Sequence, residues 1–324
     1  MKVSPALALF FLAPAVAELL SGSAPPSEFF NPIGFLLLAS LYGSGALVVR
    51  ELKVGWNKGY VSMFVLGAAY GVVEEGLMVK SFFDPGWMDL GILGVYGRWW
   101  GVNWVWAEWL TIYHAVFSIA IPITLVELAY LEKRNERWVG NKKLKGLVVL
   151  LGAVTLFGCH FLADYSPPSP QYCFFACIVA FLTLLAWKIP CNAGGNGSLQ
   201  VLKPNKLVVI GFLIALALFL YFGAGPNLVT QPLILIFLGL ILIFAIFGFL
   251  KRYDWNEGTP YHKFALAAGA VAFLIALTPF QELDKNRPDN PQGMLIVGIS
   301  ALIMLILLRQ KLVRAPSMHA HKRL

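Results

Sequence analysis

Long apolar stretches recur along the whole chain, and short polar segments separate them. An α-helix needs about 17–25 residues to cross the hydrocarbon core of a bilayer. The pattern predicts ten spans, near residues 3–20, 33–50, 60–80, 104–128, 145–164, 172–187, 207–223, 232–250, 263–280 and 293–309. Because the apolar runs are continuous, they exclude the alternating pattern of a β-barrel and predict an all-α, polytopic transmembrane helical bundle.

The composition supports a multi-pass protein of the cell membrane. Of the 324 residues, 58% are hydrophobic and 13% are charged, whereas soluble domains have about 25% charged residues. The net charge of +8 reflects the distribution of loop charges, so no nucleic-acid partner is expected. The bilayer is the expected surrounding, and the sequence does not fix an oligomeric state.

The loop charges predict an orientation. In a ten-span arrangement, 21 of the 25 Lys and Arg residues fall on one side. Positive charge marks the cytoplasmic side, so both termini are predicted to be cytoplasmic. Arg50, Glu51 and Glu127 lie near that side and are predicted to be interfacial charges.

The first span has two interpretations. Lys2, the apolar run and the small residues Ala15 and Ala17 before Glu18 also fit a cleaved signal peptide. The apolar stretch resumes after a short turn at residues 21–26, which favours an uncleaved first helix.

The chain divides by composition. Residues 1–190 carry the polar intramembrane residues and are predicted to form a front bundle. Residues 191–324 are almost purely apolar inside their spans and are predicted to form a supporting bundle with a basic tail. The glycine-rich stretch at residues 193–198 would link the two.

The candidate chemistry lies in the third, fourth and fifth spans. Glu74 and Glu75 are adjacent carboxylates inside an apolar run, where each ionised group costs about 3 kcal/mol. At 1.5 Å of rise per residue, the pair lies at a similar depth to His114, His160 and Asp164 on the next two spans. We therefore expect these five side chains to converge beneath the outer face, and Glu18 could join them.

Small residues and a proline flank the candidate site. Gly67, Ala68 and Gly71 give the third span a surface for close helix approach. Pro122 removes a helical hydrogen bond one turn beyond His114 and predicts a kink. Six of the ten tryptophans (Trp87, Trp99, Trp100, Trp104, Trp106 and Trp109) surround the loop after the third span, as an interfacial belt or as a lid.

Cysteines near the fifth span raise a separate question. Cys173 and Cys177 share a helix face, and a short loop joins them to Cys159 and His160. Free thiols, a disulfide or a zinc site are all compatible with this spacing. Free thiols are the simplest interpretation.

The ordered set of acids and histidines resembles the CPBP family of intramembrane proteases, which includes the CAAX prenyl endopeptidases. That family carries EExxxR, FxxxH and HxxxN motifs. This chain has Glu74-Glu75 before Lys80, then Leu110-x-x-x-His114, then His160-x-x-x-Asp164. The resemblance covers residues 60–165.

The resemblance implies a metal-independent peptidase without a cofactor. Glu74 or Glu75, with His114, would activate a water for attack on a peptide or lipidated-peptide substrate. His160 and Asp164 would take the place of the family's oxyanion-stabilising pair.

Two other functions remain open. The same residues could form the proton or cation site of a transporter, as intramembrane Glu and His often do. Alternatively, the protein could be a membrane scaffold in which Lys80 and Arg98, or protonation, neutralise Glu74 and Glu75.

Overall fold

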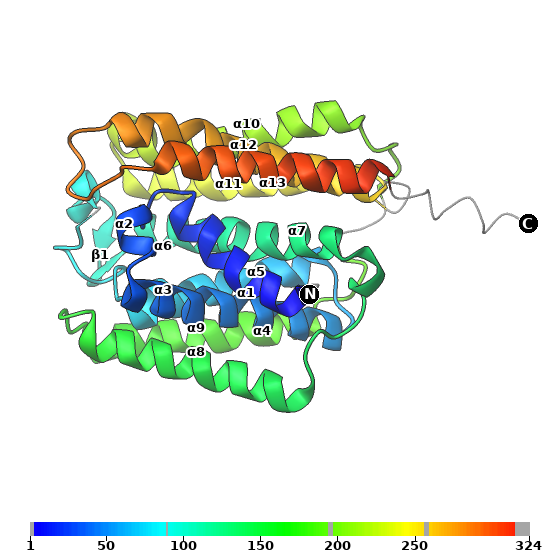
Figure 1. Cartoon of the computed structure of the whole chain (residues 1–324). Coiled ribbons are helices and arrows are strands. Elements are labelled where there is room, and N and C mark those ends of the chain that lie inside the picture. Colours follow the sequence, from blue (N-terminus) through cyan, green and yellow to red (C-terminus); the bar gives the residue numbers. More distant parts are fainter. Residues whose placement is uncertain (1–2, 89, 194–196, 256–258, 315–324) are drawn as a thin grey trace, which may run out of the picture.

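The structure is a computed structural model that describes residues 3–88, 90–193, 197–255 and 259–314 (Figure 1). Its α-helices are α1 (Pro5–Pro14), α2 (Pro26–Phe29), α3 (Pro32–Leu38), α4 (Ser44–Gly55), α5 (Tyr60–Gly71), α6 (Trp104–Tyr113), α7 (Ile121–Ala129), α8 (Asn141–Phe161), α9 (Ser169–Lys188), α10 (Pro204–Leu228), α11 (Pro232–Lys251), α12 (Pro260–Leu283) and α13 (Met294–Arg314). Short 3₁₀ turns η4 (Gly91–Gly94) and η6 (Leu131–Lys133) and the two-stranded hairpin β1 (Arg98–Trp99) and β2 (Val102–Asn103) complete the loops. Lys2, the tail after Arg314 and part of the predicted glycine-rich link lie outside the described residues.

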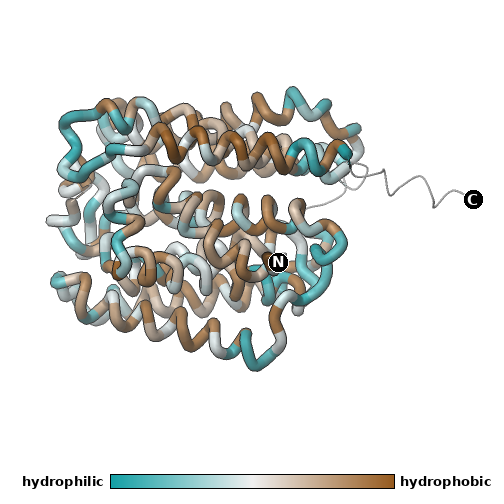
Figure 2. The backbone as a smooth tube through the Cα atoms, viewed as in Figure 1, coloured by the Kyte–Doolittle hydropathy of each residue, from teal (hydrophilic) through white to brown (hydrophobic). Residues whose placement is uncertain are grey.

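The predicted polytopic helical bundle is confirmed. Within the described part of the chain, nine helices are long and apolar enough to cross a membrane. The helix at Pro5–Leu19, predicted as the first span, is shorter than these nine. The helices are hydrophobic along their lengths and end in hydrophilic loops (Figure 2).

Proline and short polar side chains set many of the helix starts. Eight helices (α1, α2, α3, α7, α9, α10, α11 and α12) have proline in the first two positions. At the start of a helix the missing amide hydrogen costs nothing. Ser4, Asn31 and Asn103 accept hydrogen bonds from the first-turn amides of α1, α3 and α6.

Four helices contain a π-helical segment, in which the backbone hydrogen bonds skip one extra residue. These segments are η1 (Ala15–Leu19), η2 (Ala39–Gly43), η3 (Val72–Met78) and η5 (His114–Ala120). Segment η1 continues α1 and η3 continues α5. Segment η2 connects α3 to α4, and η5 connects α6 to α7. Such segments are rare in proteins, and those that occur are frequently found at functional sites. The side chains on these four segments are therefore candidates for a functional site.

Two of the helices that hold these segments are the most buried of the bundle, followed by α12 at 56% and the helix from Pro32 to Gly55 at 50%. In the helix from Tyr60 to Met78, 61% of the membrane window is buried, and in the helix from Trp104 to Ala129 the share is 72%. The corresponding share is between 11% and 22% for α8, α9, α10, α11 and α13. These outer helices form layers above and below the central ones in Figure 1 and present apolar faces suited to lipid.

A folded aromatic segment, residues 79–88 and 90–103, closes one end of the bundle. Its hairpin turns at Trp100 and Gly101, both in the left-handed region with φ of 53° and 69°, as a tight two-residue hairpin turn requires. Asn103 is fully buried, donates to the carbonyl of Tyr96 and accepts from the amide of Trp106 at 3.0 Å. Trp106 is buried whereas Trp99 and Trp100 are exposed, so the tryptophans divide between the interior and the rim.

The opposite end of the bundle holds an ionic cluster of Arg50, Glu51, Lys53 and Glu127. Arg50 lies 2.7 Å from Glu51, and Lys53 lies 2.9 Å from Glu127. Arg50 also donates to the carbonyls of the α7–α8 loop and stacks 3.6 Å above the ring of Trp138. Arg50, Glu51 and Glu127 were predicted to be interfacial charges, but all three are buried, because the loop folds back over them and leaves Arg50 and Glu51 with no exposed surface.

Both ends of the described chain lie at this same end of the bundle. The carbonyl of Val3 accepts a hydrogen bond from Tyr130, and Lys311 donates to the carbonyl of Ala129. The basic loops gather here as predicted; that this end is cytoplasmic stays a prediction. The division at residue 190 also stays a prediction, and one apolar cluster crosses it by packing Phe117 and Leu125 with Phe264 and Leu274.

Candidate functional site

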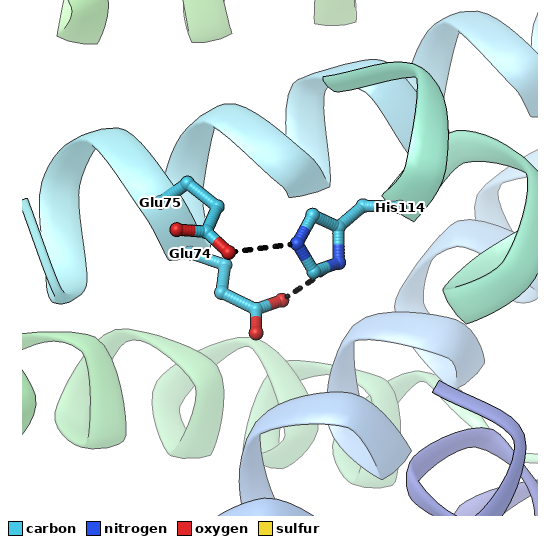
Figure 3. Close-up of side chains that lie close together, drawn as sticks. All are labelled: Glu74, Glu75 and His114. Atoms are coloured by element: carbon cyan, nitrogen blue, oxygen red, sulfur yellow. Dashed lines mark hydrogen bonds and ion pairs between the residues drawn. The ribbon is translucent and has the colours of Figure 1, made fainter. Parts of the chain in front are cut away.

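The π-helical turn η3 brings both adjacent glutamates toward one partner. In an α-helix, neighbouring side chains point about 100° apart, so one carboxylate of such a pair usually turns away. Here the amide of Val79 bonds to the carbonyl of Glu74, five residues earlier. In this wider turn Glu74 and Glu75 both face His114, which opens η5 on the neighbouring helix (Figure 3).

The imidazole of His114 lies between the two carboxylates. Its Nε2 is 3.0 Å from Glu75 Oε1, and its Nδ1 is 3.3 Å from Glu74 Oε2. Ser118, one turn further along η5, lies 2.9 Å from Nδ1. The side chains of His114 and Glu74 are 2% and 7% exposed, whereas that of Glu75 is 12% exposed. Glu75 is therefore the most accessible of the three groups.

Glycines allow the two helices to approach closely enough for these contacts. A Cβ at Gly71 would lie 3.0 Å from His114 Cβ, and one at Gly67 would lie 2.9 Å from Ala115 Cα. The predicted small-residue surface is confirmed at these two positions. Larger side chains here would push His114 away from the glutamates.

The site extends to a third carboxylate through a tyrosine. The hydroxyl of Tyr42, in η2, forms hydrogen bonds with both Glu74 Oε1 and Glu18 Oε1. Glu18 lies in η1, so the expectation that it could join the site is confirmed. We call Glu18, Tyr42, Glu74, Glu75 and His114 the acidic site; each comes from one of the four π-helical segments.

A second chain of hydrogen bonds holds Glu75 from the aromatic segment. The hydroxyl of Ser81 donates to Glu75 Oε2, and the indole nitrogen of Trp106 donates to Ser81 at 3.0 Å. Ser81 has no exposed surface. The aromatic segment thus covers the acidic site and fixes the orientation of one of its carboxylates.

Nearby cations do not neutralise the glutamates. Lys80 has a left-handed backbone conformation with φ of 62° and donates to the carbonyls of Ala163 and Tyr165. Arg98 donates to carbonyls within the aromatic segment. The only ion pairs that Glu74 and Glu75 form among the described residues are with His114. The alternative in which Lys80 and Arg98 neutralise the pair is therefore wrong, and the alternative of protonation stays open.

His160 and Asp164 do not reach the acidic site, so the predicted convergence of five side chains is wrong for these two. Both are exposed, and His160 donates to the carbonyl of Leu156 on its own helix at 2.9 Å. The physical reason is that α8 turns this face outward. Cys159, Cys173 and Cys177 are free, so the structure contains no disulfide at this position.

The sequence interpretation did not identify Tyr42, Ser81 or Ser118, since neutral hydroxyls in apolar helices carry no distinctive signal. It also passed over Glu108 in α6, which accepts a hydrogen bond from Tyr221 at 2.6 Å. A charged residue inside a predicted span was the available signal. Glu108 lies outside the acidic site and provides a matched control for it.

The acidic site can hold a cation. Three carboxylates and one imidazole come from three helices, and a fourth helix adds the hydroxyl of Tyr42. One ligand atom each from Glu74, Glu75 and His114 lie within 4.8 Å of one another. A positive ion placed there would be bound by carboxylate and imidazole, the donors that proteins use for protons and divalent metals.

Fold and site together define a polytopic helical membrane protein with a buried acidic centre. A family model matches residues 7–319, which is nearly the whole chain. The chain therefore belongs to that family, described as an uncharacterized membrane protein family. No curated protein and no solved structure matches it.

This membership corrects the resemblance drawn from the sequence. The matching family is not the CPBP protease family, so that assignment is wrong. The motif match also lacks a spatial basis in its last part, because His160 and Asp164 stand away from the acidic site. The agreement was limited to an acid pair and one histidine.

Proposed function

We propose that this protein is a cation-coupled transporter whose ion binds at the acidic site. The observation that carries the proposal is an excess of acidic side chains inside the bundle. Glu18, Glu74 and Glu75 are three carboxylates, and His114 is the one basic side chain in the acidic site. Uncompensated negative charge at membrane depth is costly, so the site gains stability by taking up a positive ion. Intramembrane acids and histidines commonly mark ion pathways.

Two further features support exchange of the ion rather than its permanent burial. Glu75 retains some exposure while its partners are sealed, which leaves one side of the site for entry. The π-helical segments that carry the ligands have weaker helical regularity than the surrounding α-helices, and such segments are frequent at functional sites.

Flux measurements in proteoliposomes test this function. Vesicles that contain the purified protein and a pH-sensitive or ion-sensitive dye are challenged with gradients of H⁺, Na⁺ and divalent cations. We expect flux of at least one cation, abolished by Glu75→Gln and Glu74→Gln and retained by the matched intramembrane variant Glu108→Gln. No flux with any of these ions, or flux equal in wild type and Glu75→Gln, would overturn the proposal.

Peptide-bond hydrolysis is the second candidate, because the 3.0 Å contact between Glu75 and His114 suits activation of a water. It ranks below transport, since the pair expected to stabilise the oxyanion, His160 and Asp164, lies elsewhere. Cleavage of a transmembrane or lipidated peptide by wild type, lost in Glu75→Gln with no change in ion flux, would reverse this order.

A further inference from the structure

We infer that Glu74, Glu75 and His114 bind one divalent first-row transition metal ion. This inference rests on the proposed transport function and names its cation. It replaces the expectation from sequence that the site needs no metal.

Each of the three side chains is held through one polar atom and offers another. Ser81 binds Glu75 Oε2, Tyr42 binds Glu74 Oε1, and Ser118 lies 2.9 Å from His114 Nδ1. The remaining atoms are Glu75 Oε1, Glu74 Oε2 and His114 Nε2, whose contacts are made within the site: Oε1 lies 3.0 Å from Nε2, and Oε2 lies 3.3 Å from His114 Nδ1. Metal sites are built this way, with outer hydrogen bonds that fix the tautomer and orientation of each ligand.

One of these remaining atoms lacks a hydrogen-bond partner. Glu74 Oε2 is buried and accepts no hydrogen bond from any described residue, and Glu74 as a whole is 5% exposed. The hydroxyl of Tyr70 is likewise buried without a hydrogen bond, and its ring packs 6.2 Å from that of His114. Buried polar atoms are normally satisfied, and a cation bound beside His114 would supply the partner that Glu74 Oε2 lacks. Glu108 Oε1 and two atoms of the ionic cluster also lack a hydrogen bond, so this feature supports the inference only together with the spacing of the ligand atoms.

The observed spacing suits a shared ion. Two ligand atoms that each lie about 2.1 Å from one metal ion are about 3.0–3.4 Å apart at the angles of octahedral or tetrahedral coordination. Glu75 Oε1 and His114 Nε2 are 3.0 Å apart. Three protein ligands leave at least one coordination position open, as in sites where the metal or its substrate exchanges.

The charges favour a divalent ion. Two carboxylates and a neutral imidazole carry a charge of −2, which a divalent cation cancels. Tyr42 has one hydroxyl proton, which it can donate to Glu74 while Glu18 supplies a second proton to the tyrosine oxygen. Glu18 is then neutral, and the complete site with its metal carries no net charge within the membrane.

The donor types select the metal class. Imidazole favours Zn²⁺, Fe²⁺ and similar ions, and carboxylate is compatible with Mn²⁺ as well. Mg²⁺ and Ca²⁺ prefer all-oxygen sites with water or many carbonyl ligands. We therefore expect Zn²⁺ or Mn²⁺ to bind and Mg²⁺ and Ca²⁺ to compete weakly.

Calorimetric titration of the chelator-treated full chain in detergent, with Zn²⁺ and Mn²⁺, tests the inference. We expect about one ion per chain, with affinity reduced at least tenfold by Glu74→Gln, Glu75→Gln and His114→Gln and unchanged by Glu108→Gln. Ser81→Ala, which removes only a positioning hydrogen bond, should weaken binding about 10-fold to 100-fold. Size-exclusion profiles identify variants that misfold, and Glu75→Gln keeps the test valid because it preserves side-chain shape.

The outcomes separate this inference from the proposed function. Equal titrations of wild type and Glu75→Gln overturn the metal site, even when proton or sodium flux is present and lost in Glu75→Gln. One bound ion per chain that depends on Glu75 supports the metal site, even when vesicles show no flux and the transport function fails.

Discussion

Two buried sets of charged side chains lie in this bundle, and the same two helices contribute to both. The helix from Pro32 to Gly55 carries Tyr42 of the acidic site and Arg50 and Lys53 of the ionic cluster. The helix from Trp104 to Ala129 carries His114 and Glu127 in the same way. The ionic cluster pairs two buried bases with two buried acids, and the exposed Arg137 lies 3.6 Å from Glu51, whereas the acidic site sets three carboxylates against one imidazole.

The two sets differ in how their charges are paired, and the proposed function rests on this difference. In the ionic cluster acids and bases pair with one another and tie the α7–α8 loop to α4, although Arg50 Nε and Glu51 Oε2 are buried without a hydrogen bond. In the acidic site the nearby bases Lys80 and Arg98 are occupied elsewhere, and the excess charge calls for a ligand. Balance of charge, rather than burial, distinguishes the two.

The largest effect is expected from Glu127→Gln in the balanced set. Glu127 lies 2.9 Å from Lys53 and 3.5 Å from Arg50. Removal of its charge leaves two buried bases with one acid, and loss of one partner of a buried pair costs about 3–5 kcal/mol. Unfolding in detergent, followed by tryptophan fluorescence during an SDS titration, should show this loss. A change below about 1 kcal/mol would mean that the cluster is not a structural lock.

Gly71→Ala should have the next largest effect. The new methyl group meets His114 Cβ and Thr111 Cα at 3.0 and 3.3 Å, and overpacking of this kind costs about 1–3 kcal/mol. The same unfolding titration measures it. Gly152→Ala is the matched control, because nothing lies within 4 Å of a Cβ there, and its stability should match or exceed that of wild type. Equal stabilities of the two variants would contradict the close approach of the central helices.

Glu75→Gln should change stability in the opposite sense to Glu127→Gln. The amide keeps the shape and can still bond to Ser81, while one unbalanced charge disappears. We expect the metal-free protein to unfold within about 1 kcal/mol of wild type or to be more stable. The comparison uses the same chemical substitution in both sets. A loss as large as that of Glu127→Gln would show that Glu75 is paired for stability.

The smallest effect belongs to the loop between α12 and α13. Hydrogen bonds from Arg287 hold the pKa of Asp289 below its ordinary value, and Arg287 also donates to the carbonyl of Gly22 at 2.6 Å. A lowered folded-state pKa stabilises the protein above the unfolded value near 3.9, and this contribution is lost as pH falls through the folded value. Asp289→Asn should lower the free energy of unfolding by less than about 1 kcal/mol at pH 7. The difference in melting temperature between wild type and this variant should become smaller as the pH falls toward 3. A difference that stays constant over this range would exclude the charge as its cause.

Some of this arrangement was predictable from sequence. The spans follow from the length of the apolar runs. Glu74, Glu75 and His114 stood out because charged and ionisable groups are expensive in apolar helices. Gly67 and Gly71 indicated close helix contact, which the structure places beside His114 and Ala115.

Other features could not be read from the sequence. The helix α8 is apolar on every side outside its basic first turn, so no stripe indicates which face turns inward, and His160 was placed on the wrong side. The π-helical turns leave the hydrophobic pattern almost unchanged, so the joint orientation of Glu74 and Glu75 was invisible. Arg50 and Glu51 were taken as interfacial because the fold-back of the α7–α8 loop is a tertiary event.

The turn at Val72–Met78 makes the number of residues itself a determinant of binding. Its hydrogen bond from Val79 to Glu74 accommodates one residue more than an ordinary turn would. Deletion of a single apolar residue between Glu75 and Val79, with every charged group retained, would let the backbone tighten and swing the segment beyond it by about 100°. Ser81 would then no longer meet Glu75. A protein with one residue fewer in this turn could therefore have all of these acids and yet bind a different ion.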